Sequence, residues 1–297
     1  MTDFLSEQNE TIRHLTEIRD RLPDHLDMSD VEKIEICETQ RNNGVLVPCI
    51  RVFYKSTPVS PCVFPPSFFH LPYDLAAACA AKEIEKRLKG ARELCENPGL
   101  KENWKDHVFI TLVNRDKNKA MLKSAVSRPF FDLEMVVRWN LQLSEDSGVM
   151  LCPVNAPEML GVSGEEFFET ARENTRRLFT PELELLSDFL NRIGMDEEVE
   201  DTVPLYILTH SGRTFGAVMM TYEDVCERTA EKLGGSFYLL PSSLHEMLVV
   251  SERNNIEKDA LKGIIHEVND TLIDKSDILS YSLYYYDEKT KKISIVQ

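Results

Sequence analysis

Residues 236–252 read SFYLLPSSLHEMLVVSE, and the apolar run on each side of the central turn has the length of a β-strand. Pro241, Ser242 and Ser243 separate the two runs. Proline fixes its own φ angle and serine hydroxyls bond nearby backbone groups, so this pattern predicts a turn between two strands. Strands joined by a short turn pair antiparallel, and an antiparallel sheet is therefore the first expectation for this chain.

The chain on both sides of this turn alternates between strand-like and helix-like segments. We expect strands over 204–210 and 214–220, a terminal hairpin over 280–297, and helices over about 222–233 and about 256–270. The first of these helices has a nearly ideal period with its apolar residues on one side. It is therefore expected to cover one face of a sheet.

The first half of the chain contains an equally clear hairpin signal. Strand-like runs at 31–40 and 45–54 flank the pair Asn43-Gly44. Both residue types tolerate a positive φ angle, which a tight turn between antiparallel strands requires. This segment therefore predicts a second antiparallel pair.

Four helices are expected between this hairpin and residue 203: an alanine-rich one from Asp74 to about Leu94, one over 116–125, and two further ones. One begins after Ser163, with Phe167 and Phe168 on its apolar face. The other is predicted to run from an N-cap at Thr180, with Pro181 in the first helical position, to Gly194.

These segments together predict an α+β fold with mixed, largely antiparallel sheets covered by amphipathic helices. We expect two lobes, because the most acidic run of the chain, MDEEVEDTV at 195–203, follows a helix-ending glycine and has the composition of a linker. The expected division is an N-terminal helix over 1–28, a first α/β lobe over 29–194, the linker over 195–203, and a second α/β lobe over 204–297.

Composition limits the classes of function and the compartment. The 297 residues contain 34 Lys and Arg against 50 Asp and Glu, a net charge of −16, which makes nucleic-acid binding unlikely. No run approaches the roughly 20 apolar residues of a membrane span. The seven cysteines are scattered without a C-x-x-C pair, so we expect free thiols in a cytoplasmic protein: Cys37, Cys49, Cys62, Cys79, Cys95, Cys152 and Cys226.

The sequence contains no H-E-x-x-H, EF-hand, Walker or G-x-G-x-x-G pattern, so we expect no metal and no cofactor. The strongest polar cluster is LPSSLHE at 240–246. If a strand begins near Leu244, Ser243 and His245 share a face and could form a nucleophile and base, with an acid supplied from elsewhere. A polar turn is the alternative, because the G-x-S-x-G context is missing. Ligand or partner binding through His245 and Glu246 is the third interpretation.

A group of arginines gives a weaker candidate. Arg172, Arg176 and Arg177 lie on one predicted helix with Glu169 and Glu173 interleaved. Opposite charges three or four residues apart form ion pairs on a helix surface. A solvated, paired face is therefore favoured over a phosphate clamp.

Four segments carry a resemblance to a known family: RPFFDLEMVVRWNL, ARENTRRLFTPEL, LPSSLHE and HEVNDTLIDKSDILSYSLYYYD. In this order and at these separations they resemble an uncharacterised bacterial domain of unknown function, common in gut-dwelling anaerobes, from about residue 30 to the end. The resemblance implies no activity. It marks as family motif positions Asn174, Thr175, Pro181, Pro241, Ser242, Ser243, His245, Glu246, Asn269 and residues 284–287.

The function favoured by the sequence is a non-enzymatic binding or regulatory module for a protein or small-molecule partner. Its expected binding residues are Ser242, Ser243, His245, Glu246, Asn174 and Asn269. The first alternative is a hydrolase that uses Ser243 and His245. A further alternative, by association with such hosts, is a mobile-element or defence accessory protein.

Overall fold

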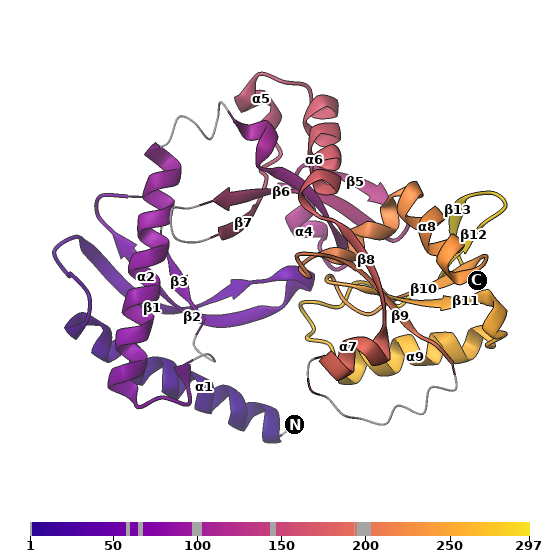
Figure 1. Cartoon of the computed structure of the whole chain (residues 1–297). Coiled ribbons are helices and arrows are strands. Elements are labelled where there is room, and N and C mark those ends of the chain that lie inside the picture. The colour runs from indigo at the N-terminus through magenta and orange to yellow at the C-terminus, as the bar shows by residue number, and fades with distance from the viewer. Residues whose placement is uncertain are drawn as a thin grey trace. The chain divides into compact units, whose positions relative to one another are not determined.

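The computed structural model describes residues 2–57, 60–64, 68–96, 103–142, 147–192, 194 and 203–297. The described chain forms two compact units (Figure 1). Unit 1 takes in the described parts of Met1–Arg41, Val45–Glu102 and Gln142–Ser147, and unit 2 those of Asn42–Gly44, Asn103–Leu141 and Gly148–Gln297. Helices and largely antiparallel sheets occur in both, which confirms the α+β prediction.

Unit 1 is a small sheet with two helices. Its strands lie in the order β1 (Val31–Gln40), β2 (Leu46–Tyr54) and β3 (Cys62–Val63), and its helices are α1 (Thr2–Arg21) and α2 (Tyr73–Glu96). β1 and β2 pair antiparallel, as the sequence predicts. Asn43 and Gly44, which follow β1, have φ angles of 60° and 71°, as the turn requires.

One face of this sheet forms the core of unit 1. Ile50, Val52 and Val63 are 0 to 1% exposed and pack with Leu15 of α1 and Ile84 of α2. Because side chains alternate along a strand, Cys49 and Arg51 point to the opposite face. The helices therefore cover one side of the sheet, and the cysteines of β1 to β3 lie on the other.

Unit 2 contains two sheets. The smaller has the order β4-β6-β5, with β7 also paired to β6, and the larger has the order β13-β12-β10-β11-β9-β8. The strands are β4 (Val108–Asn114), β5 (Ser127–Phe130), β6 (Leu133–Gln142), β7 (Ser147–Leu151), β8 (Pro181–Leu185), β9 (Tyr206–His210), β10 (Phe237–Pro241), β11 (Met247–Ser251), β12 (Tyr284–Asp287) and β13 (Lys292–Ile295).

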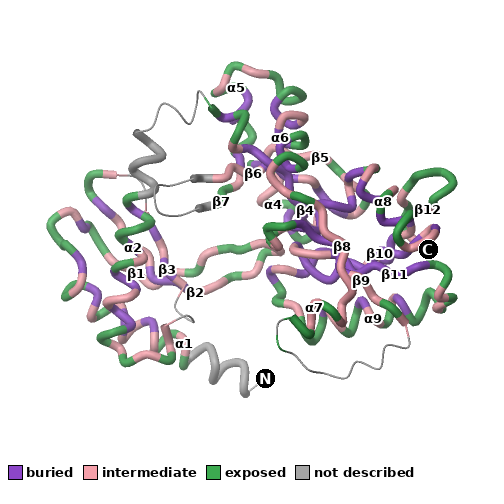
Figure 2. Tube along the Cα trace, in the orientation of Figure 1, coloured by how far each residue is buried: buried purple, intermediate pink, exposed green. Residues whose placement is uncertain are grey.

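Helices cover both sheets of unit 2 (Figures 1 and 2). They are α4 (Lys119–Leu122), α5 (Ala156–Leu160), α6 (Gly164–Leu178), α7 (Leu186–Arg192), α8 (Glu223–Leu233) and α9 (Lys258–Thr271), with a 3₁₀ turn, η5 (Gly216–Thr221), before α8. Leu239 of the larger sheet packs in the same core as α8, whereas its neighbour Leu240 packs with α9. α8 therefore covers one face, as predicted, and α9 the other.

The helix predicted over 180–194 is wrong in its first half. Pro181–Leu185 is the strand β8, which pairs antiparallel with β9, and only Leu186–Arg192 is helical. β8 lies at the edge of the larger sheet, where the missing N–H of Pro181 removes no necessary ladder bond. A long-range pairing with β9 thus overrides local signals that favour a helix start.

Two smaller expectations in unit 2 also need correction. Residues 214–220 were expected to be a strand, but η5 occupies most of them. The strand expected from Leu244 begins at Met247, and the preceding residues are a loop. In η5, Gly216 lies close to Thr209 of β9 and to the carbonyl of His245, and side-chain hydrogen bonds to Glu246 close the loop before β11. Apolar content alone reveals neither contact.

Most of the expected linker, 195–203, lies outside the described residues. β8 precedes it and β9 follows it, and these strands pair within one sheet. Both ends of the acidic segment therefore belong to unit 2, while the division between the units involves other parts of the chain.

A half-buried carboxylate joins the two sheets of unit 2. Asp132 lies in the two-residue loop between β5 and β6, directly after Phe131, whose φ angle is 54°. Its oxygens accept hydrogen bonds from Ser280 (2.5 Å) and Ser282 (3.0 Å), and from the hydroxyl of Tyr284. Burial, followed by the contact with Asp132, raises the pKa of Tyr284, so this phenol remains a donor at neutral pH. The cluster fixes the start of β12 against the smaller sheet.

The Tyr284→Phe variant tests this cluster. It removes one donor from a carboxylate and should lower the free energy of unfolding by about 2 kcal/mol. Tyr281→Phe is the matched control, because Tyr281 bonds Asp270 at the exposed surface and its loss should change stability by less than about 0.5 kcal/mol. Chemical denaturation of both variants makes the comparison, and equal effects would contradict a special role for Asp132.

Gly216 is required by a close backbone approach. A Cβ atom at this position would lie 2.1 Å from Oγ1 of Thr209 and 2.5 Å from the carbonyl oxygen of His245. Gly216→Ala should therefore destabilise the protein by about 1 to 3 kcal/mol. Gly263→Ala, in the exposed face of α9 with open space around it, should stabilise by about 0.5 to 1 kcal/mol. Denaturant midpoints of the two variants should move in opposite directions.

Candidate functional site

The LPSSLHE segment is a loop between β10 and β11 that is closed by its own side chains. Ser243 donates from Oγ to Oε1 of Glu246 at 2.6 Å, and Ser242 donates to the same atom at 3.1 Å. The Ser243 Oγ also accepts the backbone N–H of His245 at 2.9 Å. Both serines are at most 5% exposed. The pair of hydroxyls and the Glu246 carboxylate thus hold the loop in one conformation.

The same loop presents the ring of His245 to two other segments. Nδ1 accepts the backbone N–H of Phe215 at 3.1 Å, and Nε2 lies 3.6 Å from Oδ2 of Asp277. The backbone of Asp277 also accepts the N–H of Leu244 at 2.9 Å. The side chain of His245 is 31% exposed. A carboxylate from elsewhere in the chain therefore lies beside the imidazole.

Two effects act on the charge of this imidazole. Contact with the Asp277 carboxylate raises the pKa of His245 above its ordinary value of 6.5, and burial opposes this to a smaller extent. The Phe215 N–H needs an unprotonated Nδ1 as its acceptor. Protonation of His245 is therefore coupled to the position of Phe215.

Phe215 also contacts an arginine of the smaller sheet. The Arg138 guanidinium lies 4.7 Å from the centre of the Phe215 ring, whose centre is 5.8 Å from that of the His245 ring. Phe215 has a φ angle of 64°, an unfavourable conformation for a residue with a side chain. The residue with this strained backbone is thus the one whose ring lies near both the arginine and the imidazole.

Arg138 is a half-buried cation without a carboxylate. Its Nε donates to Oγ1 of the fully buried Thr111 at 2.9 Å. Burial lowers the pKa of Arg138 to about 10, so the guanidinium stays charged at neutral pH. No ion pair joins it to an acidic side chain within the described part of the chain. Its two terminal nitrogens carry four more N–H groups.

The arrangement is suited to holding an anion. A guanidinium presents its donors in a planar fork that matches a carboxylate or phosphate. The bond to Thr111 and the contact with Phe215 fix the plane of the Arg138 fork. We define the anion site as Arg138, Phe215, His245 and Asp277.

The geometry does not place Ser243 and His245 as a nucleophile and base. The Ser243 hydroxyl donates to Glu246, and Nδ1 of His245 accepts from Phe215. Across the described residues, no hydrogen bond joins the Ser243 hydroxyl to the His245 ring. Asp277 does supply an acid beside the imidazole, but the serine and the ring face different partners.

The two asparagines of the expected binding set lie in helices and make buried structural contacts. In α6, Nδ2 of Asn174 donates to the carbonyls of Lys105 and Val108, the latter at 3.0 Å. In α9, Nδ2 of Asn269 donates to the carbonyl of Ser280 at 2.9 Å. Four of the six expected residues therefore come together in one loop, while these two fasten helices to neighbouring segments.

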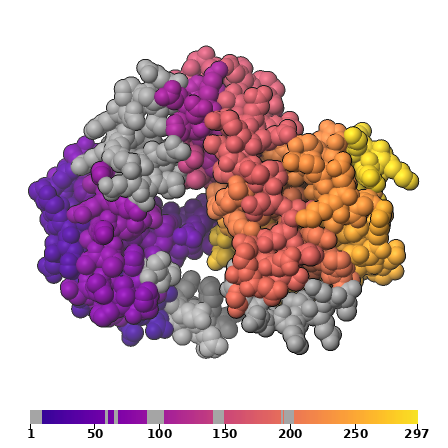
Figure 3. Space-filling model, in the orientation of Figure 1, coloured from indigo at the N-terminus to yellow at the C-terminus, as the bar shows by residue number. Residues whose placement is uncertain are grey.

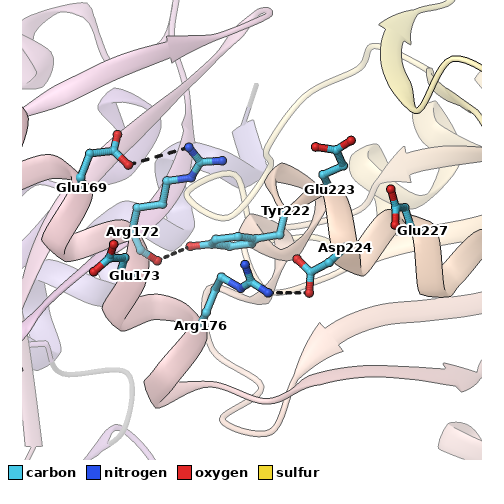
Figure 4. Close-up of a pocket in the computed structure, with 8 residues that line it drawn as sticks. All are labelled: Glu169, Arg172, Glu173, Arg176, Tyr222, Glu223, Asp224 and Glu227. Carbon is cyan, nitrogen blue, oxygen red and sulfur yellow. Dashed lines mark hydrogen bonds and ion pairs between the residues drawn. The ribbon is translucent and has the colours of Figure 1, made fainter.

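A concave surface lies between α6 and α8, whose side chains are neighbours on one face of unit 2 (Figures 3 and 4). Its volume is about 560 Å³, and its lining is Glu169, Arg172, Glu173, Arg176, Tyr222, Glu223, Asp224 and Glu227. Arg176 pairs with Asp224 at 2.6 Å and Arg172 lies 3.9 Å from Glu169. The carboxylates outnumber the arginines, and this groove would repel an anion.

Sequence reasoning did not identify Arg138, Phe215 or Asp277. The position of Arg138 could have indicated it, because it stands in the apolar run MVVRW, where a charge is expensive to bury. Asp277 lies in the last of the four segments that carry the family resemblance. Phe215 gave no signal, since its positive φ angle is not expected of a phenylalanine.

The chain belongs to a family of unknown function, DUF5688, whose model matches residues 13–288. The matched range contains every residue of the anion site. Comparison with curated proteins gave no match, and comparison with solved structures gave none either. In the described part of the chain, no helix combines the length and apolar character needed to cross a membrane. The same residues contain no group of three or more side chains placed to ligate a metal.

The contact between His245 and Asp277 predicts a pH-dependent contribution to stability. The folded-state pKa of His245 is raised above 6.5, so the contribution is present below that pH and is lost as the pH rises through the folded pKa. His245→Gln should therefore cost about 1 kcal/mol at about pH 5.5 and less at about pH 8.5. Unfolding midpoints at the two pH values provide the measurement.

Asp277→Asn supplies the control for this experiment. Without the carboxylate, the larger cost of His245→Gln at low pH should disappear or reverse, because the remaining effect of burial disfavours the charged ring. A larger cost at low pH that persists in the Asp277→Asn background would assign the effect to other groups.

Proposed function

We propose that this protein is a binding module for a small molecule bearing a carboxylate or phosphate group, which it holds at the anion site of unit 2. The observation that carries the proposal is the half-buried Arg138 guanidinium, which lies on Phe215 without an acidic partner among the described residues. Removing a cation from water is unfavourable unless an anion compensates. A ligand anion would provide that compensation.

The site is preorganised for such a ligand. Thr111 bonds Nε of Arg138, and Phe215 lies against the guanidinium, so little side-chain freedom remains to be lost on binding. The terminal N–H groups of the fork remain available for two parallel hydrogen bonds. One fixed guanidinium favours a small anionic group over an extended polyanion.

His245 adds a dependence on pH. When the ring is protonated, it balances the charge of Asp277 and adds positive potential near Phe215, on which Arg138 lies. When the ring is neutral, this positive charge is absent and an incoming anion gains less. We therefore expect tighter binding as the pH falls through the pKa of His245, which Asp277 raises.

The other interpretations have less support from this geometry. A hydrolase would need the Ser243 hydroxyl on the imidazole, but that hydroxyl donates to Glu246. Nucleic-acid binding is disfavoured by the net charge of −16. An accessory role in mobile elements or defence rests on association alone, and we argue no structural feature for it.

The test is a titration of the full chain with inorganic phosphate and, separately, with acetate. Either anion should raise the melting temperature of the wild-type protein with increasing concentration at constant ionic strength. Arg138→Gln should abolish this rise. Arg176→Gln, which removes a guanidinium that is already paired with Asp224, should leave it intact.

Two outcomes would overturn the proposal. One is a rise that Arg138→Gln retains, and the other is a rise that Arg176→Gln removes equally well. Arg138→Met separates binding from folding, because replacing an uncompensated cation should leave the unliganded protein about as stable as the wild type. A collapse of the fold in Arg138→Met would assign Arg138 to structure instead.

A further inference from the structure

Three cysteines of unit 1 lie on one face of its sheet. Cys37 of β1 is the register partner of Cys49 of β2, and Arg51 of β2 is the partner of Cys62 of β3. Residues two apart in a strand point to the same side, so Cys49 and Arg51 share a face with their partners. The face is opposite to the one that packs on α1 and α2. These thiols therefore face one another across the sheet.

The geometry of the first pair fits a disulfide. The sulfur atoms of Cys37 and Cys49 are 3.6 Å apart. Residues directly opposite in an antiparallel pair have Cα atoms about 4.5 to 5.5 Å apart, which falls within the range of disulfide-bonded cysteines. Bond formation needs the sulfurs to approach by only about 1.6 Å, which side-chain rotation can supply.

The two thiols differ in exposure. Cys49 is fully buried, and burial, followed by the contact with Cys37, raises the pKa of its thiol to about 12. Cys37 is only half-buried and can meet a dissolved oxidant. The accessible sulfur is therefore the one that reacts first, and the buried sulfur is positioned to resolve the product.

We propose that Cys37 and Cys49 are a site of reversible disulfide formation driven by a peroxide. The Cys37 sulfur attacks one peroxide oxygen, the O–O bond breaks, and sulfenic acid and one water form. The Cys49 sulfur then attacks the sulfenic sulfur, the S–O bond breaks, and the hydroxide leaves as a second water with the proton of Cys49. Two thiols are oxidised and one peroxide is reduced. A dithiol reductant reverses the change.

A packing role alone does not account for this arrangement. The core of unit 1 lies on the opposite face of the sheet and is made by aliphatic side chains such as Ile50 and Val52. Cys226 of unit 2 illustrates the ordinary case, because its thiol donates to the carbonyl of Met220 within the core. The Cys37 and Cys49 sulfurs instead contact each other.

The experiment exposes the full-length protein to hydrogen peroxide, alkylates the remaining thiols, and maps peptides by mass spectrometry without reduction. The expected result is a peptide pair linking Cys37 to Cys49, lighter by two hydrogens and released by dithiothreitol. The link should raise the melting temperature, since it removes freedom from the unfolded chain.

Variants make the assignment specific. Cys49→Ser should abolish the link and leave Cys37 open to alkylation or further oxidation. Cys226→Ser should leave the link unchanged. The proposal fails if the wild-type protein forms no link at a dose that oxidises its other thiols, or if the main product joins Cys49 to Cys62 or two copies of the chain.

Discussion

The architecture of unit 2 depends on one carboxylate that is satisfied without a cation. Asp132 receives three hydroxyl donors from the segment that leads into β12. Hydrogen bonds to a charged acceptor are stronger than those between neutral groups, and they are directional. They therefore fix the distance and the register between the two sheets, which share no ladder bond among the described strands. The segment that carries Asp277 is held next to the LPSSLHE loop by the hydrogen bond from the Leu244 N–H to the Asp277 carbonyl.

This arrangement explains why the anion site is assembled from distant parts of the sequence. Arg138 comes from the smaller sheet, Phe215 from the entrance to η5, and His245 from a loop of the larger sheet. Each element is placed by its own packing, and the site exists only where they meet. Thr209, which donates to the carbonyl of His245 at 2.8 Å, ties the loop to β9. A rigid frame thus surrounds a charged group that has no acidic partner among the described residues.

Patterns within single segments of the sequence predicted much of the fold but few residues of the anion site. The apolar runs in 236–252 and the Asn43-Gly44 pair predicted strands that the structure confirms, because these signals act within a few residues. Pro181 led to a wrong prediction of a helix start. Proline is tolerated both at the first position of a helix and in the edge strand of a sheet, and here it begins the strand β8. The contacts of Arg138 with Phe215 and of His245 with Asp277 join separate segments, and no period within one segment encodes them.

The two ends of the larger sheet have a consequence for self-association. β8 opens with Pro181 and carries Glu182 and Glu184, while β13, at the other end, begins at Lys292 after a lysine-bearing turn. Proline and charge on an outer strand disfavour the addition of a strand from another molecule. A six-stranded sheet with such borders resists growth into filaments even when the protein is concentrated. Charge and proline on the two edge strands thus protect this open sheet from pairing with strands of other molecules.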